Sequence, residues 1–323
     1  MSQISRGIHC SGFVCFVGRP NAGKSTLTNA LVGTKVAIAS DKPQTTRHII
    51  KGIVTRDDGQ LVILDTPGIH RPRTLLGERL NQLVYDTWSE VDVIGVCLPC
   101  PEKIGPGDRY LVGEIAGLKK RPVLVALATK MDIASRMRVG EHLLGISALE
   151  SEFGIEWAEI VPVSAVSGEN LDLLRDLLVS ILPEGPVYYP DGEVTDEPTE
   201  TLVAELIREV ALTVVHEELP HSITVTIEEM GLREGRGSDD QEGPADQDRR
   251  SKPLLDIYAN LIVERDSQKP IILGRQGTRL REIGTQARQR ISRLVGTQVY
   301  LNLRVKVVKD WQRDPKALNR LGF

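Results

Sequence analysis

In the first half of the chain, short apolar runs alternate with stretches whose apolar residues recur every three or four positions. Six runs are expected to be β-strands, at residues 13–17, 49–55, 61–64, 91–98, 123–128 and 160–163. Most are apolar at consecutive positions, which is typical of strands buried on both faces of a parallel sheet. Helices are expected at residues 24–32, 75–88, 108–118 and 171–182. This alternation predicts an α/β domain over residues 1–182, with a mostly parallel, doubly wound sheet.

The second half has a different pattern and follows a segment rich in proline and glycine. Residues 182–192 contain three prolines and two glycines, which predicts a linker over residues 183–198. Helices are then expected at residues 199–217 and 278–295, and strands at residues 223–227, 255–263 and 299–307. Helix 278–295 carries an apolar stripe, formed by Leu280, Ile283, Ala287, Ile291 and Leu294. We therefore expect an α+β domain over residues 199–323.

Two features of this second domain lie outside its expected core. The last strand alternates, so that one face is polar and basic and carries Tyr300, Asn302, Arg304 and Lys306. Residues 231–252 separate two strands and consist mainly of Gly, Asp, Glu, Gln and Arg. Such a segment cannot bury enough apolar area to offset its ordering entropy, so we expect a flexible surface insertion there.

Charge is also unevenly distributed, and it changes sign within the second domain. The whole sequence has 40 basic and 44 acidic side chains and a net charge of −4. Residues 275–323 contain 12 Arg and Lys against 3 Asp and Glu, a net charge of +9. The other 274 residues carry 28 basic and 41 acidic side chains, a net charge of −13. This asymmetry indicates a polyanionic partner for the C-terminal end only.

Composition excludes several classes of protein. No apolar run approaches the ~18 residues that a membrane span requires. The four cysteines are too few for a disulfide framework, which suits a reducing cytoplasm. Cys97 and Cys100 have CxxC spacing, but without a second such pair we expect ordinary strand-end cysteines rather than a metal or redox site.

A phosphate-binding motif follows the first expected strand. Residues 18–25 read Gly-Arg-Pro-Asn-Ala-Gly-Lys-Ser, which matches the P-loop pattern between a strand and a helix. Backbone N–H groups of such a loop point at phosphate, assisted by the helix N-terminus. Lys24 would reach the β- and γ-phosphates, and Ser25 would ligate Mg²⁺. The nucleotide-binding residues expected from this motif are Gly18, Asn21, Ala22, Gly23, Lys24, Ser25 and Thr26.

Two further motifs complete the phosphate and metal machinery. Residues 65–68, Asp-Thr-Pro-Gly, follow a strand, so that Asp65 can hold the metal shell and the Gly68 amide can sense a γ-phosphate. Between this motif and the P-loop, Thr45 and Thr46 offer a hydroxyl to the metal, and we favour Thr46. The expected metal-site residues are Ser25, Thr46 and Asp65. Lys24, Thr46 and Gly68 are the candidate catalytic residues.

Residues near the ends of two later strands indicate which base is bound. Residues 129–132 read Thr-Lys-Met-Asp, and Ser164 and Ala165 follow the next strand. The Asp132 carboxylate can accept two hydrogen bonds from guanine, whereas adenine would leave it unpaired. Lys130 would lie along the base, and the Ala165 amide would reach guanine O6. GTP is therefore favoured over ATP. Thr129 stands where such motifs usually have Asn, and its shorter side chain predicts weaker nucleotide binding.

A second glycine motif precedes the basic helix of the C-terminal domain. Residues 274–277 read Gly-Arg-Gln-Gly, and a GxxG turn between two helices lets the protein backbone approach a sugar-phosphate backbone closely. KH domains clamp about four nucleotides of single strand in this way, and the order of helices and strands fits their type II arrangement. The candidate RNA-binding residues are Gly274, Arg275, Gln276, Gly277, Arg279, Arg281 and Arg288.

Together these motifs resemble the Era family among the translation-factor-related GTPases. The resemblance rests on their order along the chain and on the segment 304–323, and it covers roughly residues 10–323. It implies a P-loop GTPase domain followed by a type II KH domain, GTP/GDP and Mg²⁺ as ligands, and binding near the 3′ end of 16S rRNA during 30S subunit biogenesis. The insertion is the clear departure and resembles actinobacterial members.

The resemblance carries further expectations about catalysis. In Ras-like GTPases a glutamine after the DxxG glycine orients the attacking water, but this chain has Ile69 there. His70, the next residue, is expected to be an ordinary exposed loop histidine. Catalysis would then depend on positioning, Mg²⁺ and a monovalent cation, with Asn21 at the position that related GTPases use for K⁺. Slow intrinsic hydrolysis is the prediction.

The family resemblance also implies a monomer in the cytoplasm, with peripheral association at the inner face of the membrane as an added possibility. Two alternatives stay open from the residues alone. One is a membrane-associated or cell-cycle signalling GTPase whose basic domain binds lipid or protein, although that domain lacks bulky interfacial aromatics. The other is an RNA-binding module whose GTPase-like domain is only a structural support.

Overall fold

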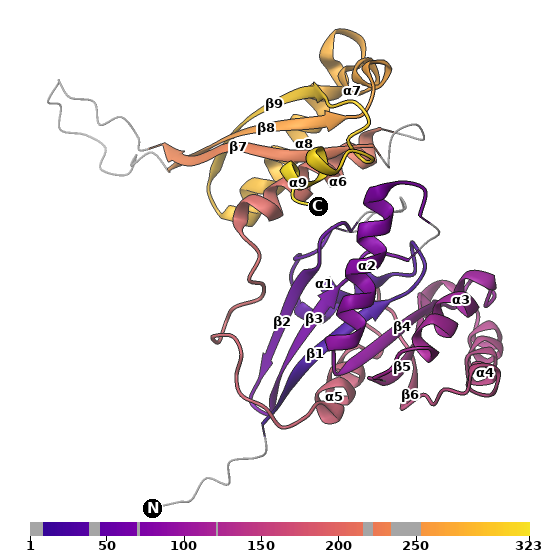
Figure 1. Ribbon diagram of the computed structural model, residues 1–323. Coiled ribbons are helices and arrows are strands. Elements are labelled where there is room, and N and C mark those ends of the chain that lie inside the picture. Colours follow the sequence, from indigo (N-terminus) through magenta and orange to yellow (C-terminus); the bar gives the residue numbers. More distant parts are fainter. Residues whose placement is uncertain (1–8, 39–45, 70–71, 121, 216–221, 234–252) are drawn as a thin grey trace, which may run out of the picture. The chain divides into compact units, whose positions relative to one another are not determined.

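The computed structural model describes residues 9–38, 46–69, 72–120, 122–215, 222–233 and 253–323 (Figure 1). The chain divides into two compact units. The first comprises residues 1–197 together with Phe323, and the second comprises residues 198–322. Each unit has its own hydrophobic core, as the two patterns of the sequence predict, and each is described by itself below.

The first unit is built on a six-stranded sheet with the order β2-β3-β1-β4-β5-β6. Its strands are β1 (Cys10–Val17), β2 (Ile50–Arg56), β3 (Gly59–Asp65), β4 (Val93–Pro99), β5 (Val123–Thr129) and β6 (Glu159–Pro162). Only the edge strand β2 runs antiparallel, against β3, and the other neighbours pair in parallel. This confirms the mostly parallel sheet.

Within the described residues, five α-helices cover the two faces of this sheet. They are α1 (Lys24–Val32), α2 (Leu75–Glu90), α3 (Pro106–Ala116), α4 (Arg136–Phe153) and α5 (Leu171–Ile181), and a short 3₁₀ turn, η1 (Met131–Ile133), precedes α4. Side chains of α1 and α5 share one core cluster with the sheet, whereas those of α2, α3 and α4 share the other. The sheet is therefore doubly wound.

Helix α4 is the element of this unit that the hydrophobic pattern did not predict. Its buried residues are only His142, Ile146 and Leu149, whereas Met137 and Leu144 are 77% and 74% exposed. Because large apolar residues lie on both its buried and its exposed face, the helix lacks the single apolar stripe on which such a prediction depends.

The proline-rich segment expected to be a linker lies against the first unit. Gln60, which is fully buried at the start of β3, accepts hydrogen bonds from the backbone N–H groups of Tyr188 (2.8 Å) and Tyr189 (2.9 Å). Its amide donates to the Tyr189 carbonyl at 2.9 Å. Tyr188 also contacts the ring of Phe13, with the ring centroids 5.2 Å apart. Residues 183–197 are thus bound to the sheet by one buried side chain and by backbone hydrogen bonds.

The end of this segment is attached to the edge strand. The Ile53 N–H donates to the Val194 carbonyl at 2.9 Å, and Lys51 Nζ pairs with Asp196 Oδ2 at 2.6 Å. Tyr189 donates its hydroxyl to the same carboxylate oxygen at 2.9 Å. These contacts lower the pKa of Asp196 against the opposing effect of its partial burial, and hydrogen bonding to Asp196 raises the pKa of Lys51.

The second unit has the element order of a type II KH domain. It contains α6 (Thr199–Val214), β7 (Thr224–Arg233), β8 (Leu254–Val263), α7 (Lys269–Leu273), α8 (Thr278–Val295), β9 (Gln298–Val307) and a short final helix α9 (Pro315–Arg320). The sheet order is β7-β8-β9, with β7 and β8 antiparallel and β8 and β9 parallel. The short helices α7 and α9 were not predicted, because five or six residues show no helical period.

Helices α6 and α8 form the core with this sheet. On α8, the side chains of Ile283, Ala287 and Ile291 are buried, but Leu294 is 39% exposed, so its predicted place on the buried stripe is wrong. The expected insertion starts later than residue 231, because β7 continues to Arg233 and Gly231 pairs with Asp256. Its remaining residues, 234–252, lie outside the described residues. Among the described residues, no helix is long and apolar enough to cross a membrane.

Candidate functional site

Most of the predicted nucleotide-site residues lie where strands of the first unit end. Gly18 directly follows β1, Asp65 is the last residue of β3, and Thr129 is the last residue of β5. Ser164 lies two residues after β6. Because these four strands run in parallel, their carboxyl ends meet at one edge of the sheet, which is where open α/β folds bind ligands.

The P-loop has a backbone conformation that depends on its glycines. Gly23 has a φ of 92°, in the left-handed region that favours glycine, and it directly precedes α1. A Cβ on Gly18 would lie 2.8 Å from the Cys97 carbonyl oxygen and 2.9 Å from the Ala22 Cβ. Asn21 also has a positive φ, 63°, which asparagine tolerates better than most residues. The motif is therefore needed for close backbone packing as well as for exposing N–H groups.

Lys24 lies within this loop, buried against the rest of the chain. Its Nζ donates to the carbonyl oxygens of Gly18 and Arg19, both at 3.1 Å. Burial lowers the pKa of Lys24, partly offset by the nearby Asp65 carboxylate. The ammonium group thus lies at the centre of the loop, hydrogen-bonded to the two carbonyls at its start.

Three oxygen-bearing side chains converge at the expected metal site. Ser25 Oγ donates to Asp65 Oδ2 at 2.6 Å, Thr46 Oγ1 lies 3.3 Å from the same oxygen, and the two hydroxyls are 3.2 Å apart. Asp65 is fully buried, which raises the pKa of its carboxyl group to about 6. Its Oδ1 atom is buried and has no hydrogen-bond partner among the described residues. A buried, incompletely paired carboxylate beside two hydroxyls fits Mg²⁺, which prefers hard oxygen ligands.

Gly68 and Ile69 follow β3 and lie close to this group. A Cβ on Gly68 would be 3.3 Å from the Pro20 nitrogen and 3.5 Å from Lys24 Nζ, so the backbone of the Asp-Thr-Pro-Gly motif passes directly beside the P-loop. Ile69 is buried in the core cluster formed with α2, α3 and α4. Thr45 and His70 lie outside the described residues.

The predicted base-binding residues are connected to one another and to the P-loop. Ser164 Oγ donates to Asp132 Oδ1 at 2.7 Å and accepts N–H groups of Val166 (3.3 Å) and Ser167 (3.0 Å). Through these contacts Ser164 holds the Asp132 carboxylate in place. Lys130, between β5 and Asp132, has a φ of 57°.

Thr129 makes a contact that the sequence did not predict. Its hydroxyl donates to the Ala22 carbonyl of the P-loop at 2.7 Å. The shorter side chain at this position therefore still ties the end of β5 to the phosphate-binding loop. Weaker nucleotide binding stays a prediction.

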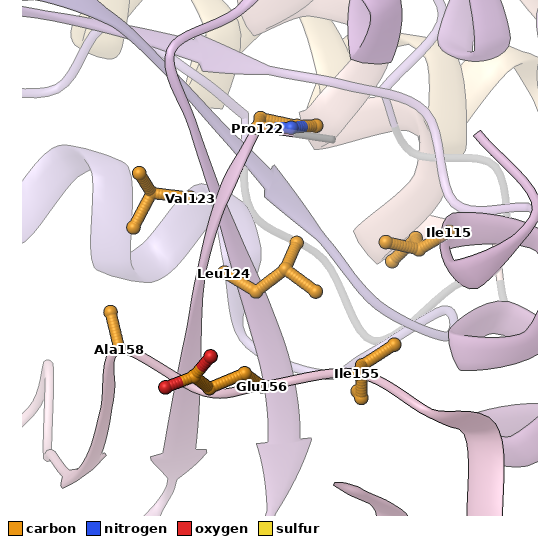
Figure 2. A pocket seen from close by; sticks show the side chains of 7 residues that line it. All are labelled: Ile115, Pro122, Val123, Leu124, Ile155, Glu156 and Ala158. Atoms are coloured by element: carbon orange, nitrogen blue, oxygen red, sulfur yellow. The ribbon is translucent and has the colours of Figure 1, made fainter. Parts of the chain in front are cut away.

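Neither the cysteine pair nor a cavity at the other end of β5 belongs to this site. Cys97 and Cys100 are buried free thiols, and burial raises their pKa values to about 12 and about 11. In the described residues no group of His, Cys, Asp and Glu could hold a metal ion by itself. A cavity of about 410 Å³ lies beside the first residues of β5, at the strand end opposite Thr129 (Figure 2). Its one charged side chain is the carboxylate of Glu156, which does not suit a phosphate ligand.

The GxxG turn of the second unit lies between α7 and α8. Gly274, Gln276 and Gly277 have φ values of 68°, 49° and 76°. A Cβ on Gly274 would be 2.8 Å from the Arg279 Cβ, so this glycine lets the turn fold back against the first turn of α8. No atom lies within 4 Å of the corresponding Cβ position on Gly277.

The arginines near this turn divide into two groups. Arg279 donates to the Ile271 carbonyl at 2.6 Å, and Arg290, one of the basic residues of α8, pairs with Glu209 of α6 at 2.7 Å. These two arginines help to hold the fold. By contrast, Arg275, Arg281 and Arg288 are exposed, and none forms an ion pair within the described part of the chain.

These two sites define the class of protein: a P-loop GTPase domain followed by a KH domain. Residues 13–130 match the family model "50S ribosome-binding GTPase", and residues 248–312 match the model "KH domain". The chain is 64% identical to GTPase Era of a Nocardioides species and 60% identical to that of Streptomyces coelicolor. Both comparisons cover 98% of this chain and 96% of the relative. The chain belongs to the Era GTPase family.

Two solved structures resemble the whole chain. One is a variant of Aquifex aeolicus Era bound to GDP·AlF₄⁻, at 37% identity and a TM-score of 0.84. The other is Era in complex with MgGDPNP and nucleotides 1506–1542 of 16S ribosomal RNA, at 36% identity and a TM-score of 0.85. Each covers 97% of this chain and 99% of its own.

Proposed function

We propose that this chain hydrolyses GTP in its first domain and binds the 3′ region of 16S rRNA with its second, in the biogenesis of the 30S subunit. The observation that carries the proposal is that one chain holds two sites. One is a P-loop joined to a buried carboxylate and two hydroxyls, and the other is a GxxG turn beside exposed arginines that form no ion pair with any described residue. The relative bound to MgGDPNP and 16S rRNA nucleotides supports it, because it resembles this chain over nearly its whole length.

In the phosphate site, the proposed roles use side-chain and backbone groups that already lie at or beside the P-loop. Lys24 would exchange its contacts with the Gly18 and Arg19 carbonyls for the β- and γ-phosphate oxygens. The N–H groups of residues 21–26 would hold the β-phosphate, and the Gly68 amide would contact the γ-phosphate. Ser25, Thr46 and Asp65 would hold Mg²⁺, which supplies positive charge to the phosphates. These residues would position the phosphates and neutralise their charge, and none of them would act as a general base.

In the base site, Asp132 would accept the guanine N1–H and N2–H groups, with Ser164 orienting its carboxylate at 2.7 Å. Lys130 would lie along the ring, and the Ala165 N–H would donate to O6. Thr129 would connect base recognition to phosphate binding through the Ala22 carbonyl. This arrangement favours GTP, because adenine would leave Asp132 without donors.

Slow intrinsic turnover follows from the residue after the DxxG motif. Ile69 is buried in the core and carries no group that could orient water. We propose that Asn21, with its positive φ, places its side chain to coordinate K⁺ beside the phosphates, as the resemblance implies. GTP hydrolysis that is equally fast with K⁺ and with Na⁺ would contradict this role.

In the RNA site, Gly274 and Gly277 would let single-stranded RNA approach the backbone of the turn, with Gln276 and the exposed Arg275 beside it. Arg281 and Arg288 would contact phosphates farther along α8, whereas Arg279 would act mainly by holding the turn. We propose domain limits of 1–182 and 199–323, with residues 183–198 between them. We further propose a cytoplasmic monomer with the 30S subunit as its partner; a peripheral membrane contact is the second candidate.

The test is to sequence RNA that is crosslinked to the protein in cells, with Lys24→Ala and Gly277→Asp variants in parallel. We expect reads concentrated near the 3′ end of 16S rRNA, and their loss in Gly277→Asp. Enrichment nowhere in ribosomal RNA would overturn the RNA assignment. If Lys24→Ala kept full nucleotide binding and cellular function, the first domain would be only a structural support.

A further inference from the structure

Arg19, the second residue of the P-loop motif, connects the loop to helix α3. Its Nε donates to Asp108 Oδ1 at 2.6 Å, and its terminal NH₂ group donates to Glu102 Oε2 at 2.8 Å. Its backbone carbonyl also accepts hydrogen bonds from Lys24 Nζ (3.1 Å) and from the Ala22 N–H (3.2 Å). One residue therefore closes the P-loop through its backbone and is itself held by two carboxylates from the segment after β4.

The anchor for Arg19 is rigid. The Asp108 side chain is only 2% exposed, and its second oxygen accepts the Gly105 N–H at 2.8 Å at the start of α3. A Cβ on Gly107 would lie 2.8 Å from Arg19 Cδ, so the arginine stem lies closely against the first turn of this helix. Charge-assisted hydrogen bonds to a carboxylate are about twice as strong as neutral ones, and this carboxylate cannot rotate away.

We propose that Arg19 is a positioning residue for GTP hydrolysis, which sets the P-loop conformation through its ion pair with Asp108. The guanidinium fixes the side chain, and the side chain fixes the peptide that carries the Arg19 carbonyl. That carbonyl in turn orients the Ala22 N–H, and before GTP binds it also holds Lys24 Nζ. The inference rests on the phosphate-binding roles proposed above for the P-loop.

The physical reason for such an anchor lies in the loop itself. Two glycines and a left-handed Asn21 make the P-loop backbone adaptable, so its N–H groups hold one arrangement only if something outside the loop constrains it. A misplacement of about 1 Å at a catalytic site can cost about 100-fold in rate. An interaction between loop and helix can therefore affect the rate without touching GTP.

The test compares Arg19→Met with Arg109→Met in the full-length protein. Arg109 is the matched control, because it also forms an ion pair, with Glu152 at 2.9 Å, and lies on α3 directly after Asp108. We expect Arg19→Met to lower kcat/KM for GTP by about 10- to 100-fold, mostly in kcat, with Arg109→Met within twofold of the unchanged chain. Arg19→Lys, which keeps the charge but loses the second donor, should recover part of kcat.

Three outcomes would overturn the inference: unchanged kinetics in Arg19→Met, equal losses in Arg19→Met and Arg109→Met, or a loss confined to KM. If Arg19→Met does not fold, as judged by circular dichroism, Arg19→Lys and Asp108→Asn decide instead. Each should lower kcat, and in combination they should lower it by less than the product of their separate effects. Independent effects would refute the coupling. Lys24→Ala separates failure of the proposed function from failure of this inference. Its activity tests whether the P-loop binds the phosphates, and it does not depend on the ion pair between Arg19 and Asp108.

Discussion

The two ligand-binding turns of this protein share one local design and differ in their surroundings. Helices α1 and α8 each begin directly after a glycine in the left-handed region, Gly23 and Gly277, and each turn also contains a non-glycine residue with positive φ. In the first turn the cation, Lys24, is buried and hydrogen-bonded to the loop. In the second, Arg275 is exposed. Under the roles proposed above, the same backbone conformation would serve an enclosed small ligand in one domain and an accessible polymer in the other.

The largest expected effect comes from removing the buried cation. Lys24→Ala should lower kcat/KM for GTP by about 100- to 1000-fold, because a preorganised charge on the phosphates is lost. RNA affinity, measured without nucleotide, should change little. Steady-state phosphate release and fluorescence anisotropy measure the two effects. Lys119→Ala, an exposed lysine after α3, is the control. A loss of less than threefold would mean that the enclosed turn does not act through Lys24.

The buried carboxylate should produce the next largest effect, on stability. The folded-state pKa of Asp65, about 6, lies above the ordinary value of 3.8, so ionisation of this carboxyl group lowers stability as pH rises from about 3.8 to about 6, and the full loss is present above pH 6. Asp65→Asn should therefore stabilise the nucleotide-free protein at pH 7.5 by at most about 3 kcal/mol, with no gain at pH 3.5. Urea unfolding at the two pH values measures this. The variant should also lose its Mg²⁺-dependent gain in GTP affinity. Destabilisation at pH 7.5 would contradict the assignment.

A negative charge in the open turn should weaken RNA binding without affecting hydrolysis. Gly277→Asp places a carboxylate in open space but strains a backbone whose φ is 76°, so we expect some loss of stability together with a fall in RNA affinity of about tenfold. Gly296→Asp is the matched control, because Gly296 also has positive φ (70°) and open space, but at the other end of α8. Equal affinity losses in both variants would show that charge on the domain, and not the turn, determines binding.

The smallest effect separates the free arginines from the paired ones. Arg281→Gln should reduce the slope of log affinity against log salt by about 0.7, the value for one phosphate contact with single-stranded nucleic acid. Arg290→Gln should leave the slope unchanged and instead lower the unfolding temperature, because it removes the ion pair with the buried Glu209 carboxylate. If both variants changed the slope equally, the distinction between arginines that contact RNA and arginines that hold the fold would be wrong.

Strong local periodicity explains which parts of the fold the sequence predicted. Helices 24–32 and 278–295 agree with α1 and α8 at both ends, because a glycine precedes each and the apolar positions recur regularly. Helix α4 was missed because its exposed Met137 and Leu144 disturb that pattern. The candidate site was predicted from motifs with fixed spacing. Two contacts could not be predicted in this way, those of Thr129 with Ala22 and of Arg19 with Asp108, because they join residues far apart in the chain.

By itself the sequence determined the two domains, the basic C-terminal end and the two glycine turns, because these depend on composition and on neighbouring residues. Only the tertiary structure decided that the proline-rich segment is bound to the sheet through Gln60. It also decided that Arg279 and Arg290 bind other elements, whereas Arg281 and Arg288 form no ion pair in the part of the chain that the structure describes. The physical reason is that a side chain's partners are set by packing between distant elements. A motif in the sequence identifies a charged side chain as a candidate for binding a ligand. Only the fold shows whether that side chain already has a partner within the protein.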